Sequence, residues 1–258
     1  MEQPSQSLTI NSSKDATGVS HDFTVKYPNG LYLRGHWEIA LEISTMFYSW
    51  TNVSAEQNTN TLRYSPDTGT TWHTLTIPDG NYNVVDIDAI FKAFQVTTTG
   101  TAVISIVPNF NTGHVLIQIS DPNYRLDLSG SEMYRLFGFS VAQVAAPLAV
   151  TTNSANIADI TLGRNMIMIG CSLLSNSLSV YDNGNYGATL YSFSPDAPPQ
   201  SLLTVQPSER VYLSLAPDQR VDHIRMYLID NLGRAVNLRG ETATYRIHLR
   251  KAQKPDAW

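Results

Sequence analysis

Residues 226–251, MYLIDNLGRAVNLRGETATYRIHLRK, hold two strand-like segments around a short polar connection. Side chains of a strand point alternately to the two faces of a sheet, so an alternating pattern predicts one buried and one exposed face. The last segment has this pattern, with an apolar series (Tyr245, Ile247, Leu249) between basic residues (Arg246, His248, Arg250). The stretch therefore predicts a closing strand pair with one packed face and one charged face.

The rest of the last third has the same character. Residues 164–174, RNMIMIGCSLL, form a nearly continuous apolar run, as expected for a strand buried on both faces. Short alternating segments follow at spacings of roughly 10 to 20 residues, separated by Pro- and Gly-containing turns. Such a series indicates an all-β sandwich, barrel or jelly roll.

A long strand is also predicted early in the chain, at residues 36–50. Its apolar series is expected on one face and its second series, which is acidic, on the other. The first series is Trp37, Ile39, Leu41 and Ile43, and the second is Glu38, Ala40, Glu42 and Ser44.

Residues 72–140 predict a compact α/β module. Ile87, Ile90, Phe91 and Phe94 recur at helical spacing, and Asn83 can cap a helix of about ten residues. A hairpin is expected from residues 101–108 and 114–120 and a short strand at 124–128. Ser129 and Glu132 fit a capping box for a second helix, and Gly138 fits its end.

The expected organisation follows from these segments. Residues 1–20 are polar and lack periodicity, which predicts a flexible N-terminal arm. Residues 21–60 and 155–251 are expected to form the β domain. The module at 72–140 is expected to be inserted between early strands of that domain.

Composition excludes several classes of protein. Charged residues make up 15% of the chain, against roughly 25% in an average soluble domain, and the net charge is −5. Direct nucleic-acid binding is therefore not expected, because it depends on clustered Lys and Arg. Cys171 is alone and is expected to be a buried thiol. No signal-peptide pattern and no apolar run of about 18 residues occurs, so neither export by a standard signal nor a membrane span is expected.

The sequence offers no clear catalytic or metal-binding pattern, and we expect neither an enzyme nor a cofactor. The six histidines lack zinc-site spacing, and no G-x-S-x-G elbow is present. Glu38 and Glu42 would lie roughly 13 Å apart on a strand, too far for a glycosidase pair. Tyr181, Tyr186 and Tyr191, with Phe193, could form a sugar-binding platform, interface anchors or ordinary packing.

The C-terminal stretch resembles the penton, or minor capsid, proteins of Maverick/Polinton elements, adintoviruses and related virophages. The matching positions are an Asp-x-x-Gly turn, a later glycine and a basic-ended last strand: Asp230, Gly233, Arg234, Gly240, His248, Leu249 and Arg250. The middle module is similar to the family at the turn with Gly80 and at Gly138. It departs from the family pattern there, with Pro78-Asp79-Gly80 for Pro-Gly and Phe137-Gly138-Phe139 for Leu-Gly-Phe.

This resemblance implies a single jelly roll without catalytic residues. It implies a homopentamer at the five-fold vertices of an icosahedral virion, beside a double jelly-roll major capsid protein and with a spike or fibre as a further partner. Assembly inside the host cell is then expected. Glu38 and Glu42 of one subunit could pair with Arg246, His248 and Arg250 of the next.

Other functions remain open at the level of sequence. A lectin-like or receptor-binding β-sandwich would use the loop with Tyr181, Tyr186 and Tyr191. A hydrolase on the same fold would need an acid pair that no motif indicates. A cement protein between capsomers would differ from a vertex protein only in stoichiometry.

Overall fold

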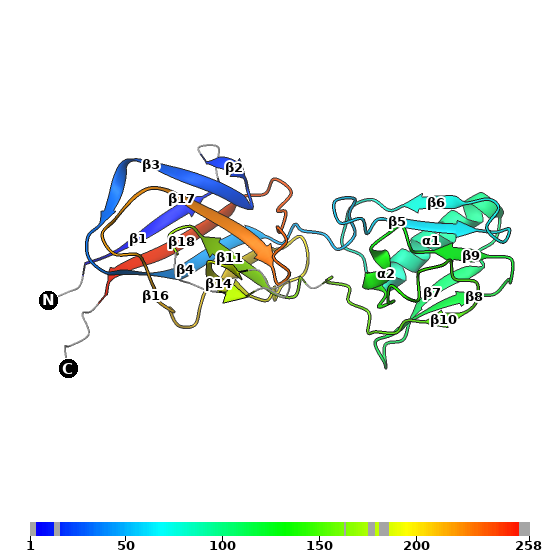
Figure 1. Ribbon diagram of the computed structural model, residues 1–258. Coiled ribbons are helices and arrows are strands. Elements are labelled where there is room, and N and C mark those ends of the chain that lie inside the picture. Colours follow the sequence, from blue (N-terminus) through cyan, green and yellow to red (C-terminus); the bar gives the residue numbers. More distant parts are fainter. Residues whose placement is uncertain (1–3, 13–15, 163, 175–178, 181–185, 253–258) are drawn as a thin grey trace. The chain divides into compact units, whose positions relative to one another are not determined.

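The computed structural model describes residues 4–12, 16–162, 164–174, 179–180 and 186–252 (Figure 1). The chain forms two compact units. Unit 1 combines Met1–Trp50 with Gly163–Trp258, and unit 2 is Thr51–Leu162. Unit 2 is thus longer at both ends than the module expected at 72–140.

Unit 1 is built from two antiparallel sheets. The first has the order β1-β18-β4-β15, with β16 also paired to β4, and the second has the order β14-β11-β17-β3-β2. A separate ribbon pairs β12 with β13. The bounds are β1 Ser5–Asn11, β2 Thr17–Val19, β3 Asp22–Leu33, β4 Trp37–Phe47, β11 Ile167–Cys171, β12 Ser179–Val180, β13 Tyr186–Gly187, β14 Thr189–Phe193, β15 Leu202–Val205, β16 Leu213–Ser214, β17 Gln219–Asp230 and β18 Ala243–Lys251.

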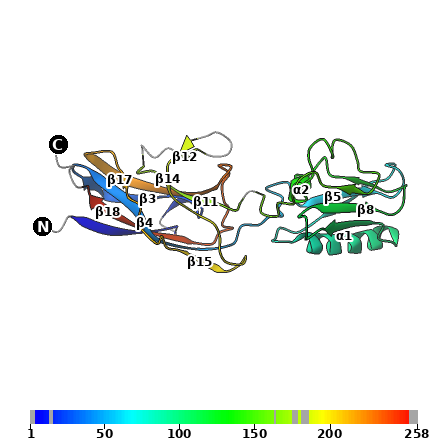
Figure 2. The same cartoon turned by 90° about the horizontal axis from the view of Figure 1, so that it is seen from below.

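The strand pairing defines a jelly roll, which confirms the predicted fold class. Eight of the strands pair in a nested series along the chain: β1 with β18, β3 with β17, β4 with β15, and β11 with β14. This is the pattern of one long hairpin wrapped into two facing sheets, which Figure 2 shows as two layers. Unit 2 is inserted between the third of these strands, β4, and the fourth, β11.

The two strands of residues 226–251 do not pair with each other as expected. Strand β17 lies in the second sheet and β18 in the first, so the two strands belong to opposite layers. The connection folds back on β17 through a bridge between Ile229 and Ala235 and then buries Val236 and Leu238 completely. The side chains of Val236 and Leu238 belong to the core between the two sheets, whereas a polar hairpin loop would stay exposed.

The prediction of a flexible N-terminal arm is wrong for Ser5–Asn11. This segment is strand β1, in register with Thr244–Arg250 of β18, and Ile10 is buried in the core. Its periodicity is weak because it is an edge strand that buries little besides Ile10. Backbone hydrogen bonds to β18 hold this segment in the sheet, although its side-chain pattern does not indicate a strand.

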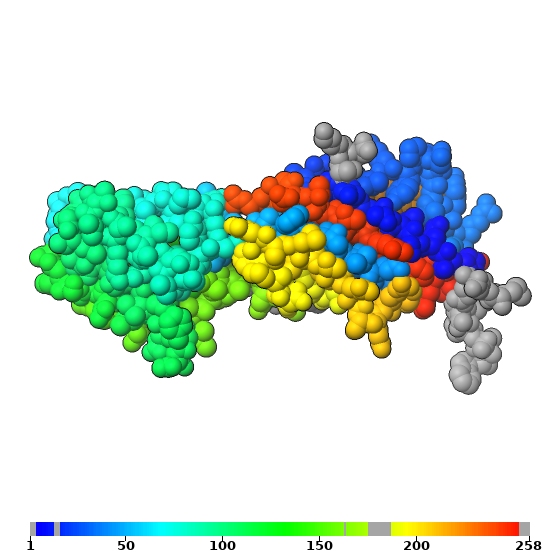
Figure 3. All heavy atoms as spheres, turned by 180° about the vertical axis from the view of Figure 1, so that it is seen from behind, coloured from blue at the N-terminus to red at the C-terminus, as the bar shows by residue number. Residues whose placement is uncertain are grey.

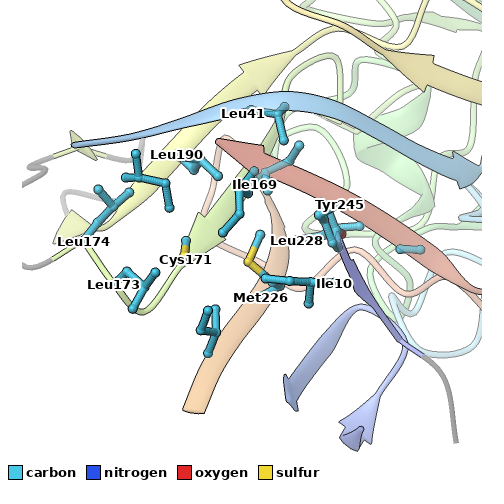
Figure 4. Close-up of a cluster of buried hydrophobic side chains, with 14 of the residues drawn as sticks. Ile10, Leu41, Ile169, Cys171, Leu173, Leu174, Leu190, Met226, Leu228 and Tyr245 are labelled. Atoms are coloured by element: carbon cyan, nitrogen blue, oxygen red, sulfur yellow. The ribbon is translucent and has the colours of Figure 1, made fainter. Parts of the chain in front are cut away.

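The core of unit 1 lies between the two sheets (Figure 4). Every residue of β11 is buried, as the apolar run predicted. Cys171 belongs to this strand, and its burial raises the pKa of the thiol to about 12. Tyr245 also points into the core, where its ring stacks on Phe23 with centroids 6.1 Å apart.

Gly170 of β11 is covered by an aromatic ring. Its cross-strand partner is Tyr227 of β17, and a Cβ atom at position 170 would lie 2.1 Å from the ring of Tyr227. The guanidinium of Arg225 lies over the same Tyr227 ring, 5.1 Å from its centroid. Glycine is therefore required here by close approach rather than by backbone conformation.

Unit 2 combines helix α1 with two small antiparallel sheets, ordered β10-β8-β7 and β6-β5-β9. Its core is a second cluster of buried apolar residues, which shares no residue with the core of unit 1. The bounds are β5 Thr61–Ser65, β6 His73–Thr76, α1 Val84–Thr99, β7 Ile104–Pro108, β8 Val115–Ile119, β9 Arg125–Asp127, α2 Met133–Leu136 and β10 Thr152–Asn153.

Helix α1 confirms the predicted helix and is longer than expected. Asn83 caps it in a capping box with Asp86, and Gly100 ends it with a φ of 81°. Its polar side chains also close the edge of β7. Gln95, fully buried, accepts the N–H of Ile104 at 2.9 Å and donates to its carbonyl at 2.8 Å, while Asp88 accepts the N–H of Ile106 at 2.7 Å.

Helix α2 differs from its prediction at the start. Glu132 is the residue at the N-cap position, and its side chain makes no capping hydrogen bond. Ser129 instead donates from its backbone and its hydroxyl to Asp127, and Ser131 accepts the N–H of Met133. A serine beside an acidic residue can thus satisfy a local turn rather than a capping box.

The two ends of unit 2 meet at one side chain. Asn52 donates from Nδ2 to the carbonyls of Tyr82 (2.7 Å) and Ile160 (3.0 Å) and accepts the N–H of Tyr82 (3.0 Å). Nearby, Gly80 forms a two-way backbone bridge with Val53, and the Tyr82 ring lies against it. The beginning and the end of the insertion are therefore held close together.

Candidate functional site

The outer face of the first sheet is shaped by a β-bulge in β4. Ile247 pairs with Leu41 and Arg246 with Ile43, so Glu42 is the extra residue. The bulge reverses the predicted alternation after Leu41. Ser44 is fully buried and faces the core opposite Tyr245, while Ile43 is half-buried opposite the outward-facing Arg246.

Two cross-strand ion pairs lie on this face. Arg250 Nε is 2.8 Å from Glu38 Oε2, and Arg246 Nε is 2.8 Å from Glu42 Oε2. The structure therefore brings together the residues that the sequence assigned to an interface. These ion pairs lie within one chain, whereas pairing between subunits was expected.

The segment between β15 and β16 adds a second layer of contacts. Arg210 forms an ion pair with Glu42, and Ser7 of β1 donates to the same carboxylate at 2.9 Å. Tyr212 lies under Arg250, 3.5 Å from ring centroid to guanidinium carbon, and its hydroxyl is 2.9 Å from His248 Nδ1. Sequence reasoning missed these three residues, because they lie in an aperiodic loop and an edge strand.

We call Glu38, Glu42, Arg210, Tyr212, Arg246, His248 and Arg250 the charged face. Partial burial raises the pKa of Glu42, but the Ser7 hydrogen bond and the charges of Arg210 and Arg246 outweigh it, so the pKa is lowered overall. Burial is also the main cause of the lowered pKa of His248, and Arg210 and Arg250 add to it against the opposing charge of Glu42.

The charged face has more cations than anions. Its two carboxylates face three guanidinium groups, and these arginine side chains are still 40–52% exposed. Each arginine has five N–H donors, so donors remain for acceptors on another surface. The exposed ion pairs contribute only about 0 to 1 kcal/mol each to folding, which suits a role in orienting contacts.

A second polar cluster lies at the end of β17. Asp230 is fully buried and accepts the backbone N–H groups of Leu232 (3.0 Å) and Arg234 (2.9 Å) and Nε of Arg234 (2.7 Å). Arg164, only 6% exposed, lies 3.7 Å away. The Asp-x-x-Gly motif is therefore a buried ionic turn that stabilises the passage between the two sheets.

The glycines of the family motifs occupy turns. Gly233, Gly240 and Gly138 have φ angles of 74°, 87° and 78°, in the left-handed region. At Gly138 a side chain is also excluded by space, because a Cβ atom would lie 2.3 Å from the carbonyl oxygen of Asn156. These residues have structural roles and contact no described reactive group.

Only part of the expected tyrosine platform lies within the described residues. Tyr181 lies outside the described residues, and of Tyr186 only the backbone, in β13, is described. Tyr191 is half-buried on β14 opposite Ile169 and, like Phe193, packs against the core of unit 1. For Tyr191 and Phe193 the structure thus shows packing.

In the described part of the chain, no group of three or more His, Cys, Asp or Glu side chains is arranged to hold a metal ion. Within the same residues, neither helix has the length and hydrophobicity of a membrane span.

The strand pairing defines a jelly roll with eight nested strands that carries a folded insertion. No protein-family model and no curated protein matches the chain. Among solved structures, the chain is similar to the mavirus penton protein, known from a crystal of its selenomethionine-labelled form. The similarity covers 96% of this chain and 100% of that chain, with a TM-score of 0.47 and 7% sequence identity.

Proposed function

We propose that the chain is a penton-type capsid protein, five copies of which form a ring at each five-fold vertex of an icosahedral virion. The observation that carries the proposal is the position of the motif residues within a complete jelly roll. Asp230 and Gly233 hold the passage between the sheets, and His248 and Arg250 lie on the strand that joins β1 to β4. Jelly rolls are a common architecture of viral capsid proteins.

The charged face supplies a surface for a neighbouring subunit. Because Glu38 and Glu42 are paired within the chain, the arginines rather than the carboxylates are the groups that reach outward. Their remaining donors would meet carbonyl or carboxylate acceptors of the next copy. A contact that repeats by a fixed rotation closes into a ring, so weak contacts become cooperative. The double jelly-roll major capsid protein would surround that ring, and a spike or fibre would dock on it.

The native mass of the purified protein tests the ring directly. A pentamer would have five times the subunit mass of 28.6 kDa. Arg246→Gln should raise the concentration at which the ring dissociates, and high salt should do the same. Arg135→Gln is the matched control, because Arg135 has similar exposure and pairs with Glu132 in unit 2.

The proposal is wrong if the chain stays monomeric at high concentration and is also absent from shells assembled with the major capsid protein. The second condition matters because a vertex ring can require its capsid neighbours. A monomer that binds glycans, and loses binding in Tyr186→Ala, would support the ligand-binding alternative.

A further inference from the structure

Three neighbouring loops of unit 2 present apolar side chains to solvent. Phe110, Val141 and Ile157 are 85%, 68% and 66% exposed. The loops are joined by backbone hydrogen bonds, from Ala158 to Gly113 (2.8 Å) and from Asn156 to Gly138 (2.9 Å). We call this set the apolar loop surface. Figure 3 shows the β7–β8 loop, in green, projecting from unit 2.

The apolar loop surface lies in a part of the chain without formal charge. Residues 93–120 and 136–158 contain no Asp, Glu, Lys or Arg, although such residues make up 15% of the whole chain. A partner that placed a charge here would lose its hydration without gaining an opposite charge. The complementary surface is therefore uncharged and apolar.

Phe110, the most exposed residue of this surface, lies in a hydrogen-bonded turn. Asn109 Oδ1 accepts the N–H groups of Asn111 (3.1 Å) and Thr112 (3.3 Å), and its carbonyl accepts the N–H of Gly113 (2.8 Å). Ile157 packs so closely on Gly113 that a Cβ atom there would lie 2.9 Å from it. Little conformational entropy is lost when such a preorganised loop binds.

The size and chemistry of the surface indicate its occupant. Three exposed apolar side chains offer a few hundred Å², below the roughly 800 Å² per partner of a standard interface, so this contact alone would not hold a free pair. The absence of Lys and Arg also disfavours an anionic membrane. We infer that the apolar loop surface contacts a second copy of this chain, as one of several repeated contacts in the ring. This inference rests on the proposed function.

Site-directed photo-crosslinking tests the inference. Asn111→Cys places a thiol beside Phe110 and leaves the Phe110 side chain in place. Cys171 is buried and unreactive, so the label goes to position 111. The thiol is labelled with a maleimide-benzophenone, and the assembled protein is irradiated. Val96→Cys is the control, because Val96 is 51% exposed on α1, and its neighbour Gln95 contacts the start of β7, roughly 15 Å from the loop.

We expect covalent dimers and larger products from Asn111→Cys but not from Val96→Cys. Adding Phe110→Ser should remove those products and raise the dissociation concentration of the ring at least tenfold, with an unchanged melting temperature. If the subunit ring assembles but Asn111→Cys gives no crosslinked products, or gives as many as Val96→Cys, the inference is overturned and the proposed function stands. A chain that forms no ring alone or with the major capsid protein would overturn both.

Discussion

The ring of Tyr227 lies directly against the backbone of Gly170, its cross-strand partner in the second sheet. A Cβ atom at position 170 would be 2.1 Å from Cζ of Tyr227, so either the ring or the strand would have to move. Because β11 is buried along its whole length, we expect Gly170→Ala to lower the free energy of unfolding by about 1–3 kcal/mol. Urea unfolding measures this loss.

The matched control is Gly130→Ala. No atom lies within 4 Å of a Cβ there, so the substitution should be close to neutral. In a double-mutant cycle, Tyr227→Ala should relieve most of the cost of Gly170→Ala. An equal cost with and without the ring would show that the contact is not the cause.

Asp230→Asn tests the buried ionic turn. Asparagine keeps an oxygen for the backbone N–H groups of Leu232 and Arg234 but loses the charge that faces Arg234 and Arg164. Breaking a buried ion pair by removing one charge is strongly destabilising, so we expect a loss of about 3 kcal/mol in the free energy of unfolding.

Asp222→Asn is the control for the ionic turn. Asp222 also pairs with an arginine, Arg220 at 2.8 Å, but it is 57% exposed. Its substitution should change stability by less than about 1 kcal/mol. Similar losses at positions 222 and 230 would contradict a special role for burial.

Gln95→Ala should open the edge of β7. The side chain makes hydrogen bonds to the backbone of Val103 and Ile104, and their loss leaves buried polar groups unsatisfied, at a cost of about 2 kcal/mol or more. An exposed strand edge also favours pairing with another chain, so light scattering should show faster aggregation. Thr97→Ala, on the exposed side of α1, should change neither property. Unchanged aggregation of Gln95→Ala would show that the edge is closed by other means.

Stability should fall below about pH 6.5 partly because of His248. The pKa of its imidazole is lowered in the folded chain from the unfolded value of 6.5, so the unfolded state takes up a proton first as the pH falls. This contribution is fully present above pH 6.5 and is lost as the pH falls through the folded pKa. The free energy of unfolding, measured with urea, should therefore fall more between about pH 8 and about pH 5.5 for the wild type than for His248→Asn. Parallel losses in the two proteins would contradict the assignment.

Much of the local structure could be predicted from the sequence. Helix α1 follows from the spacing of Ile87 and Phe91 and from the cap at Asn83, because these signals lie within a few turns of one another. The buried strand β11 follows from its apolar run. The charges of the outer face could also be found, since Arg246 and Arg250 alternate with buried residues.

Long-range pairing could not be predicted in the same way. Nothing near residues 226–251 indicates that β17 and β18 enter different sheets, because their partners are β3 and β4, early in the chain. The bulge at Glu42 depends on the register with β18, and it decides which side of the sheet Ser44 faces. Tyr212 lies in a loop far from Arg250 in the sequence, and only the fold brings its ring beneath the Arg250 guanidinium.

The hydrogen bonds of Asn52 to both ends of unit 2 have a consequence for the order of folding. If unit 2 were unfolded, joining β4 to β11 would close a loop of about 120 residues, whereas a folded unit 2 shortens the effective loop to about a dozen and lowers the entropic cost of closure by about 2 kcal/mol. On the ribosome, unit 2 is complete before β11 is synthesised. Strands β1 and β4 must then wait for β18, which lies between them and follows the other strands of the roll along the chain, so the first sheet is completed only after all of them have been synthesised.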